Sequence, residues 1–328
     1  ASDVYKRQVF SILLTNNRKM KKFLLVLVIT GISTLNLGIS QEITGKTFFH
    51  YSRPSGDDAN SSFGFKRVYL TATKKVSENI TYKFQADVDY KSSPQNMYIK
   101  NAKVDWKINQ GKIVIGMQGM NMFKIQENTW GKRYIQKMSM DQFKYSSSAD
   151  IGIGLYKSIN KFGFSALITN GNGYKKSEND DHKKLSFQAV YGEQKLNKND
   201  GFNLGGSFST EPYDLDTLTV KNRSVMGVFA GYAKNNIRGG LEWNQKEDAG
   251  ENITSQILST YGNYQVKTNL GIFFRYDMFS PYKKESSDDK NHLIAGFEYS
   301  PGKGLIIAPN YRKSGDDSTI LVNFEFKF

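Results

Sequence analysis

The chain has 328 residues, 38% of them hydrophobic and 13% aromatic, with 45 basic against 31 acidic residues and no Cys. The lack of Cys excludes a disulfide scaffold, a thiol nucleophile and Cys-ligated metal sites. The mean hydropathy of -0.53 excludes a bundle of membrane helices, and 22 Phe and 19 Tyr are too many for a disordered chain. The composition therefore favours an all-β protein.

The first 40 residues have the pattern of targeting sequence. Residues 1–19 precede a start methionine, Met20, and fit no structural pattern, so we expect a non-native or upstream translated segment there. Residues 20–40 carry two lysines, a short apolar run and small residues before Gln41, which predicts a cleaved signal peptide and export through the inner membrane; a membrane anchor is the weaker alternative. Without residues 1–40 the chain keeps 39 basic and 30 acidic residues, a net charge of +9, in a single domain at 41–328.

Alternating apolar and polar side chains indicate strands along the rest of the chain. Residues 80–90 alternate strictly, residues 101–108 and 269–278 do so less purely, and residues 320–328 alternate to the last position. A period of two residues is typical of strands with one apolar face and one polar face. A soluble sandwich would show the same pattern, so the alternation alone does not distinguish it from a membrane barrel.

Three features favour a transmembrane antiparallel β-barrel. The strands run to about ten to twelve residues, which suits tilted strands that cross a bilayer. Short and long connections alternate, beginning with a long one at 53–62, and the sequence ends within a strand, on Phe328. Counting segments predicts sixteen strands around a water-filled channel; fourteen or eighteen strands stay open because residues 251–266 alternate poorly.

The polar face of each strand is expected to face the lumen, because a Lys at mid-depth in lipid would cost about 2–4 kcal/mol. This assignment places eight basic and seven acidic residues inside, so the lumen is expected to be nearly balanced in charge. The basic residues are Arg67, Lys83, Lys103, Lys107, Arg238, Arg275, Arg312 and Lys327, and the acidic residues are Asp87, Asp89, Asp105, Glu242, Asp277, Glu298 and Glu325.

With a signal peptide, sixteen strands, a terminal Phe328 and a long third outer loop, the chain resembles a trimeric-type outer-membrane porin of Gram-negative bacteria. The stretches 112–119, 127–133 and 150–154 are similar to the phosphate-selective porin O and P family. The resemblance implies an outer-membrane location, a homotrimer, and recognition of Phe328 by the barrel-assembly machinery. The sequence shows no ladder of closely spaced lumen Arg residues.

The third outer loop, residues 121–149, is the longest predicted connection. The resemblance implies that it folds into the barrel and forms the constriction; an external loop with solvated charges is the alternative. Its charged residues are Lys124, Lys132, Arg133, Lys137 and Lys144 against Glu127 and Asp141, a net charge of +3. A positive constriction favours anions. We therefore predict passive diffusion of small hydrophilic solutes and ions, with a weak anion preference that arises mostly from this loop.

Other functions are less well supported. A channel specific for phosphate or another anion, or a non-conducting structural or adhesive barrel, is the alternative. None of the three histidines shares a motif with a Ser or a carboxylate pair, so we predict no enzyme, no metal site and no cofactor. The basic residues form no stripe or recognition helix, which argues against nucleic acid as a partner. Outer-membrane lipid is the expected surrounding, and paired aspartates in the outer loops could bridge cations to lipopolysaccharide, although solvated loop tips explain them more simply.

Overall fold

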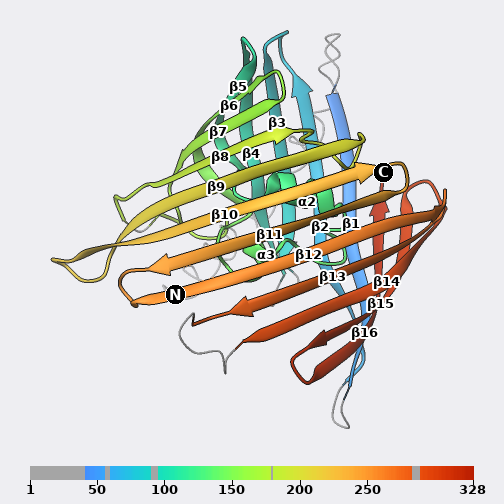
Figure 1. The fold of residues 1–328 in the computed structure, drawn as a ribbon. Coiled ribbons are helices and arrows are strands. Elements are labelled where there is room, and N and C mark those ends of the chain that lie inside the picture. Colours follow the sequence, from blue (N-terminus) through green and yellow to red (C-terminus); the bar gives the residue numbers. More distant parts are fainter. Residues whose placement is uncertain (1–40, 56–59, 90–94, 179, 283–288) are drawn as a thin grey trace, which may run out of the picture. The chain divides into compact units, whose positions relative to one another are not determined.

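The computed structural model describes residues 41–55, 60–89, 95–178, 180–282 and 289–328. These residues form a closed barrel of sixteen antiparallel strands (Figure 1). Each strand pairs with its neighbours in the sequence, and β1 pairs with β16 to close the sheet. The prediction of an all-β, sixteen-strand barrel is confirmed. The predicted segments 1–19 and 20–40 lie outside the described residues, as does the side chain of Asp89.

The strands differ in length, and the three shortest lie in the first half of the barrel. No helix of the described residues is long and apolar enough to cross a membrane. The strands are β1 (Gln41–Pro54), β2 (Ser62–Lys75), β3 (Ile80–Asp89), β4 (Asn96–Ile108), β5 (Gly111–Gly119), β6 (Ala149–Ile159), β7 (Phe162–Thr169), β8 (Lys184–Gly192), β9 (Gly201–Asp214), β10 (Val220–Lys234), β11 (Ile237–Asp248), β12 (Ile253–Lys267), β13 (Leu270–Ser280), β14 (Lys290–Gly302), β15 (Leu305–Ser314) and β16 (Asp317–Lys327).

The two ends of the barrel differ in their connections. At one end, two-residue turns such as 160–161 and 235–236 join neighbouring strands, and Asn160 and Asn235 occupy the positive φ that such turns require. The connection 193–200 is the longer exception at this end. The other end carries the long connections, including 120–148 and 170–183. We refer to these as the short-turn end and the long-loop end.

Side chains alternate between the two faces of the wall as the sequence predicts. On β3, Tyr82 and Phe84 are exposed on the outside, whereas Lys83 and Gln85 line the interior. Large apolar side chains such as Phe187 and Leu241 are likewise exposed on the outer face. So wide an apolar surface is unfavourable in water and is typical of a barrel surrounded by lipid.

Two strands in the first half of the barrel, β2 and β4, carry a β-bulge that changes which side chains point inward. Where β1 pairs with β2, Phe48 faces Arg67 and Phe49 faces Phe65, so Lys66 is the extra residue. Where β3 pairs with β4, Gln85 faces Asn101 and Ala86 faces Ile99, so Lys100 is the extra residue. A bulge shifts the alternation by one position and re-aims a side chain. Both bulged lysines contact the long connection 120–148, Lys66 at Ile135 and Lys100 at Ser148.

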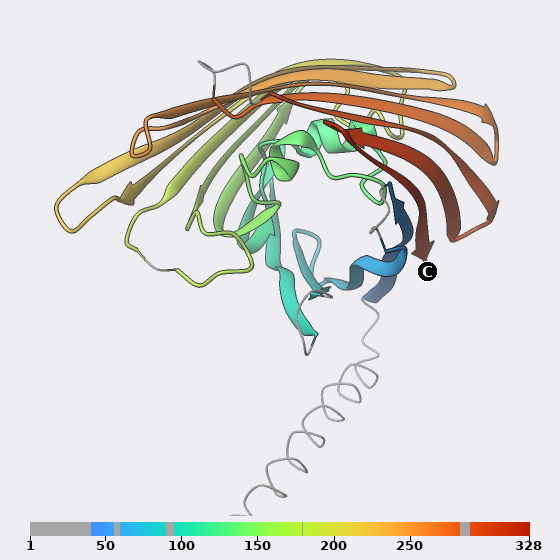
Figure 2. The same ribbon diagram turned by 90° about the horizontal axis from the view of Figure 1, so that it is seen from below.

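The connection between β5 and β6 folds into the barrel and packs against one side of the wall (Figure 2). It contains two short helices, α2 (Lys124–Trp130) and α3 (Ser139–Gln142), and α2 contacts β10, β11 and β12. Its side chains Met122, Trp130, Ile135, Met138 and Met140 are fully buried. They form one apolar cluster with inward side chains of the strands, including Val225, Ile257, Phe273 and Ile294. Burial of each large side chain contributes about 1.5–3 kcal/mol, so the loop is held as a packed core within the lumen.

Candidate functional site

Barrel side chains hold the interior loop (120–148) by its backbone. Six of them donate hydrogen bonds to its carbonyl oxygens: Lys66 to Ile135 (2.8 Å), Arg312 to Ile135 (2.7 Å), Arg275 to Lys137 (2.8 Å), Asn263 to Trp130 (3.1 Å), Asn323 to Tyr134 (3.4 Å) and Tyr261 to Gln126 (3.4 Å). These donors come from β2, β12, β13, β15 and β16. The loop is therefore fixed to one part of the wall, and the solvent-filled space lies on its other side.

Acidic side chains of the same wall bind side chains of the interior loop. Glu298 forms an ion pair with Lys132 (Nζ to Oε1, 2.6 Å) and accepts a hydrogen bond from the Tyr134 hydroxyl at 2.6 Å. Glu242 accepts a hydrogen bond from the Ser139 hydroxyl. Removing one partner of such a buried pair typically leaves a costly unpaired group. Glu242 and Glu298 therefore help to hold the interior loop in position.

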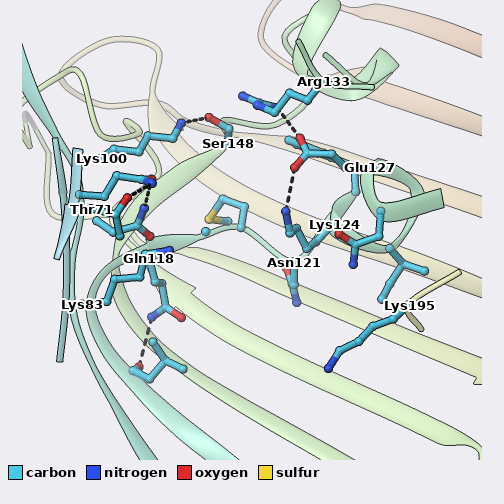
Figure 3. Close-up of a pocket in the computed structure, with 18 of the residues that line it drawn as sticks. Thr71, Lys83, Lys100, Gln118, Asn121, Lys124, Glu127, Arg133, Ser148 and Lys195 are labelled. Atoms are coloured by element: carbon cyan, nitrogen blue, oxygen red, sulfur yellow. Dashed lines mark hydrogen bonds and ion pairs between the residues drawn. The ribbon is translucent and has the colours of Figure 1, made fainter. Parts of the chain in front are cut away.

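Between the interior loop and the opposite wall lies an open path with a volume of about 1060 Å³ (Figure 3). Its acidic lining consists of Glu42, Glu127 and Glu325. Lys157 also borders it, but its strand position faces outward, opposite Phe164. The other basic side chains that line the path number nine: Lys46, Lys83, Lys100, Lys103, Lys112, Lys124, Arg133, Lys195 and Lys327. The path is therefore strongly cationic, and lysine supplies most of its charge.

Most charges of the interior loop neutralise one another. Arg133 contacts both Glu127 and Asp141, the latter at 3.2 Å. Glu127 also pairs with Lys124 at 2.8 Å, and Lys137 pairs with Asp141 at 3.1 Å. Burial raises the pKa of Glu127, but the positive charges of Arg133 and Lys124 outweigh it and lower the pKa to about 2. Lys144, the remaining predicted charge of this loop, is exposed.

Lys100 lies across the path from Arg133 (Figure 3), and a compact cluster of side chains surrounds it. The ammonium nitrogen of Lys100 contacts the Ser148 hydroxyl and lies 3.8 Å from the centre of the Tyr174 ring. The Tyr174 hydroxyl lies 3.4 Å from both Arg67 and Asp87, which form an ion pair at 3.0 Å. Tyr174 belongs to the loop 170–183, so two long loops contribute to this level of the pore.

The structure divides the predicted lumen residues into two groups. The first group lies on the side of the open path: Lys83, Lys103, Glu325 and Lys327 line it, Arg67 and Asp87 belong to the Lys100 cluster, Asp105 pairs with Lys103 and Lys112, and Lys107 is exposed near the end of β4. The second group lies on the wall that holds the interior loop and consists of Arg238, Glu242, Arg275, Asp277, Glu298 and Arg312. Of the six acids whose side chains the structure describes, Glu242, Asp277 and Glu298 are in the second group, and of the other three only Glu325 lines the open path. The expected near balance of lumen charge therefore does not hold for the open path.

Lys66 and Lys100 are the inward residues that strict alternation misses. A signal for each was present, because the apolar positions change phase at the bulge. Residues 97 and 99 are apolar before Lys100, whereas 102, 104 and 106 are apolar after it. Residues 63 and 65 precede Lys66, and 68 and 70 follow it, in the same way. Tyr174 lies in a loop without periodicity, so no pattern in the sequence pointed to it.

Comparison with known proteins agrees with this architecture. The family model for phosphate-selective porin O and P matches residues 46–239. Similar solved structures include Salmonella typhi OmpF in complex with daunomycin (14% identity, 89% of this chain and 98% of that chain, TM-score 0.70), an anion-selective porin from Comamonas acidovorans (11%, 88% and 100%, 0.65) and the trimer form of Vibrio cholerae OmpT (13%, 88% and 99%, 0.65). No curated relative matches the sequence. The TM-scores show that these structures share the fold of this chain, and because the identities are low the likeness extends to the fold alone.

Proposed function

The chain belongs to the phosphate-selective porin O and P family, and on that premise we propose that it is an outer-membrane porin through which small hydrophilic solutes diffuse passively, with anions preferred. The observation that carries the anion preference is the open path, lined by nine inward-facing basic residues and three acidic ones. Fixed positive charges in a narrow, low-dielectric wall raise the local concentration of anions and repel cations. Membership of a porin family also supports a channel and not an enzyme.

The origin of the preference differs from the one that the sequence suggested. Four basic residues of the interior loop, Lys124, Lys132, Arg133 and Lys137, each pair with a carboxylate. The lysines of β1, β3, β4, β5 and β16 face the open path, and Asp105 and Glu325 are the acids that pair among them. The strands that border the open path, and not the interior loop, therefore supply most of the unbalanced positive charge.

A channel specific for phosphate or another small anion is the second candidate. Arg133 and the bulged Lys100 border the path from opposite sides, with Arg67 next to Lys100. Such convergence of cations could hold an oxyanion briefly. Saturation of phosphate conductance, or block of chloride current by phosphate, would support this candidate, whereas conductance that rises linearly with phosphate concentration would oppose it.

The test of the main proposal is the reversal potential of the refolded 41–328 barrel in a planar bilayer under a salt gradient. We expect the potential to have the sign of anion preference. Cation preference in the unaltered protein would overturn the proposed selectivity. Liposome swelling with sugars of graded size tests the pore itself, because a non-conducting structural or adhesive barrel would admit none of them.

Export and assembly complete the proposal. We propose cleavage of the signal peptide 20–40, loss of residues 1–19, and assembly as a homotrimer, which is the form of the similar Vibrio cholerae OmpT structure. Insertion by the barrel-assembly machinery through Phe328 is supported by the position of this residue: its backbone pairs with Gly45, and the residue is 80% exposed. Lipid and lipopolysaccharide are the proposed surroundings. The mass of the mature protein tests cleavage, and triplet closures in single-channel recordings test the trimer.

A further inference from the structure

The outer face of the barrel contains an apolar groove of about 580 Å³ over β6–β10. Its floor is made of small residues: Ala166 on β7, Ala189 on β8 and Gly206 on β9. Along one row across the sheet, Phe164 faces Ala189, Ala189 faces Gly206, and Gly206 faces Val228. Two small residues, Ala189 and Gly206, therefore lie between the larger side chains of Phe164 and Val228 in this row.

Large side chains form the rim of the groove. In the adjacent row, Phe187 lies between Ala166 and Phe208, and Phe208 faces Met226. Phe187 is 47% exposed although it is apolar. A Cβ added at Gly206 would meet only the carbonyl oxygen of Gly227 at 3.4 Å and a methyl group of Val228 at 4.0 Å. The depth of the groove thus comes from the missing side chains and not from a close approach of the backbone.

One cation, Lys157, borders the groove. It lies two residues before the end of β6, at the short-turn end, and the preceding residue, Tyr156, points to the other side of the wall, where the Lys112 ammonium group lies 5.4 Å from the centre of its ring. The outward positions 113–117 of β5, 151–159 of β6, 162–168 of β7 and 185–191 of β8 hold no other charged residue in this described part of the wall. Lys157 therefore has no carboxylate near it on the outer face.

Position and charge together indicate the occupant. The short turns of outer-membrane barrels lie on the periplasmic side, so Lys157 is at the level of the phospholipid headgroups of that leaflet. A lysine stem packs along apolar surface while its ammonium group reaches the interface, where phosphate is the available anion. Burial of Lys157 against a second copy of this apolar wall would leave the charge unpaired, which is unfavourable.

We propose that this groove binds one acyl chain of an anionic phospholipid from the periplasmic leaflet, with the Lys157 ammonium group paired to the headgroup phosphate. The small residues of the floor admit the chain, and the aromatic rim fixes its direction. This site is on the lipid-facing surface, so it is independent of the ion preference of the pore. The reversal potential can fail to show anion preference while lipid binding is retained, and the reverse.

Native mass spectrometry of the full refolded barrel tests the headgroup contact. The probes are phosphatidylglycerol and phosphatidylcholine with identical acyl chains. We expect the unaltered protein to retain phosphatidylglycerol more strongly, and Lys157→Gln to lower that retention about fivefold while phosphatidylcholine is unchanged, because one interfacial cation contributes about 1 kcal/mol. Lys234→Gln, at an outward position at the short-turn end of β10, is the matched control and should behave like the unaltered protein. Equal effects of the two substitutions would overturn the headgroup contact.

Filling the floor tests the acyl-chain contact. Ala189→Phe should reduce retention of both lipids, whereas Ala102→Phe, at an exposed outward position on β4 away from the groove, should reduce neither. Unchanged single-channel conductance in both variants verifies that the barrel is folded. If Ala189→Phe instead shifts trimer to monomer and leaves lipid retention unchanged, the groove is a contact between copies and the proposal is wrong.

Discussion

The two sides of the lumen wall carry similar polar side chains but use them differently. On the side that binds the interior loop, Arg275, Arg312, Glu242 and Glu298 bond to that loop and are withdrawn from water. On the side that faces the open path, lysines such as Lys83 border solvent. A polar inward position is therefore not sufficient to act on a solute. The interior loop decides which charges reach the path.

The largest expected effect comes from removing the apolar anchor of the interior loop. Trp130 is fully buried and meets the rings of Tyr261 and Phe273 edge-on, with centroid distances of 5.8 Å and 6.2 Å. We expect Trp130→Ala to weaken the docking of the loop by about 3–5 kcal/mol. Single-channel conductance should rise and become noisy. The charged residues behind the loop should then be exposed to the pore like those on the open side. Trp106→Ala, at an exposed outward position, is the control; equal conductance changes in both variants would contradict the packing argument.

The second prediction concerns charge on the open side. Lys100→Gln removes a cation that borders the path, so the anion-to-cation permeability ratio should fall about two- to fivefold, which corresponds to roughly 0.5–1 kcal/mol of screened Coulomb energy. Lys144→Gln removes a charge of the same sign from an exposed position of the interior loop and should leave the ratio unchanged. Reversal potentials of the two variants measure the difference. A larger effect of Lys144→Gln than of Lys100→Gln would mean that the charges of the interior loop determine the anion preference.

The sequence predicts the fold better than it predicts the pore. Alternation and connection lengths depend on local contacts with lipid and water, so they predict the barrel, a count of about sixteen strands and the long loop. Which wall the loop covers depends on contacts between residues far apart, such as Lys132 with Glu298. The bulges at Lys66 and Lys100 are an intermediate case. The apolar positions of the sequence shift by one residue at each bulge, but a strict period of two assigns the wrong face to these lysines.

The third prediction tests the covered side. Glu298→Gln leaves Lys132 without its ion-pair partner behind the interior loop, so we expect lower thermal stability and more open-channel noise. The permeability ratio should change little, because Glu298 does not border the main path. Lys132→Met with Glu298→Gln removes both charges and should restore part of the stability. A shift of reversal potential in Glu298→Gln as large as that in Lys100→Gln would break the distinction between the two sides.

The smallest expected effect is the response of the interior loop to acid. The pKa of Glu127 is about 2 in the folded protein, below its usual value of 4.5, because Arg133 and Lys124 oppose the effect of burial. A carboxyl group whose pKa is lowered by folding stabilises the fold above its unfolded pKa and loses that contribution as the pH falls through the folded value. Open-channel noise should therefore stay constant from pH 7 to about pH 4.5 and increase as the pH approaches 2. Glu127→Gln should be noisier at pH 7 and should lack this particular increase. Noise in the unaltered protein that stays constant from pH 4.5 to pH 2 would mean that the ion pairs of Glu127 do not hold the loop.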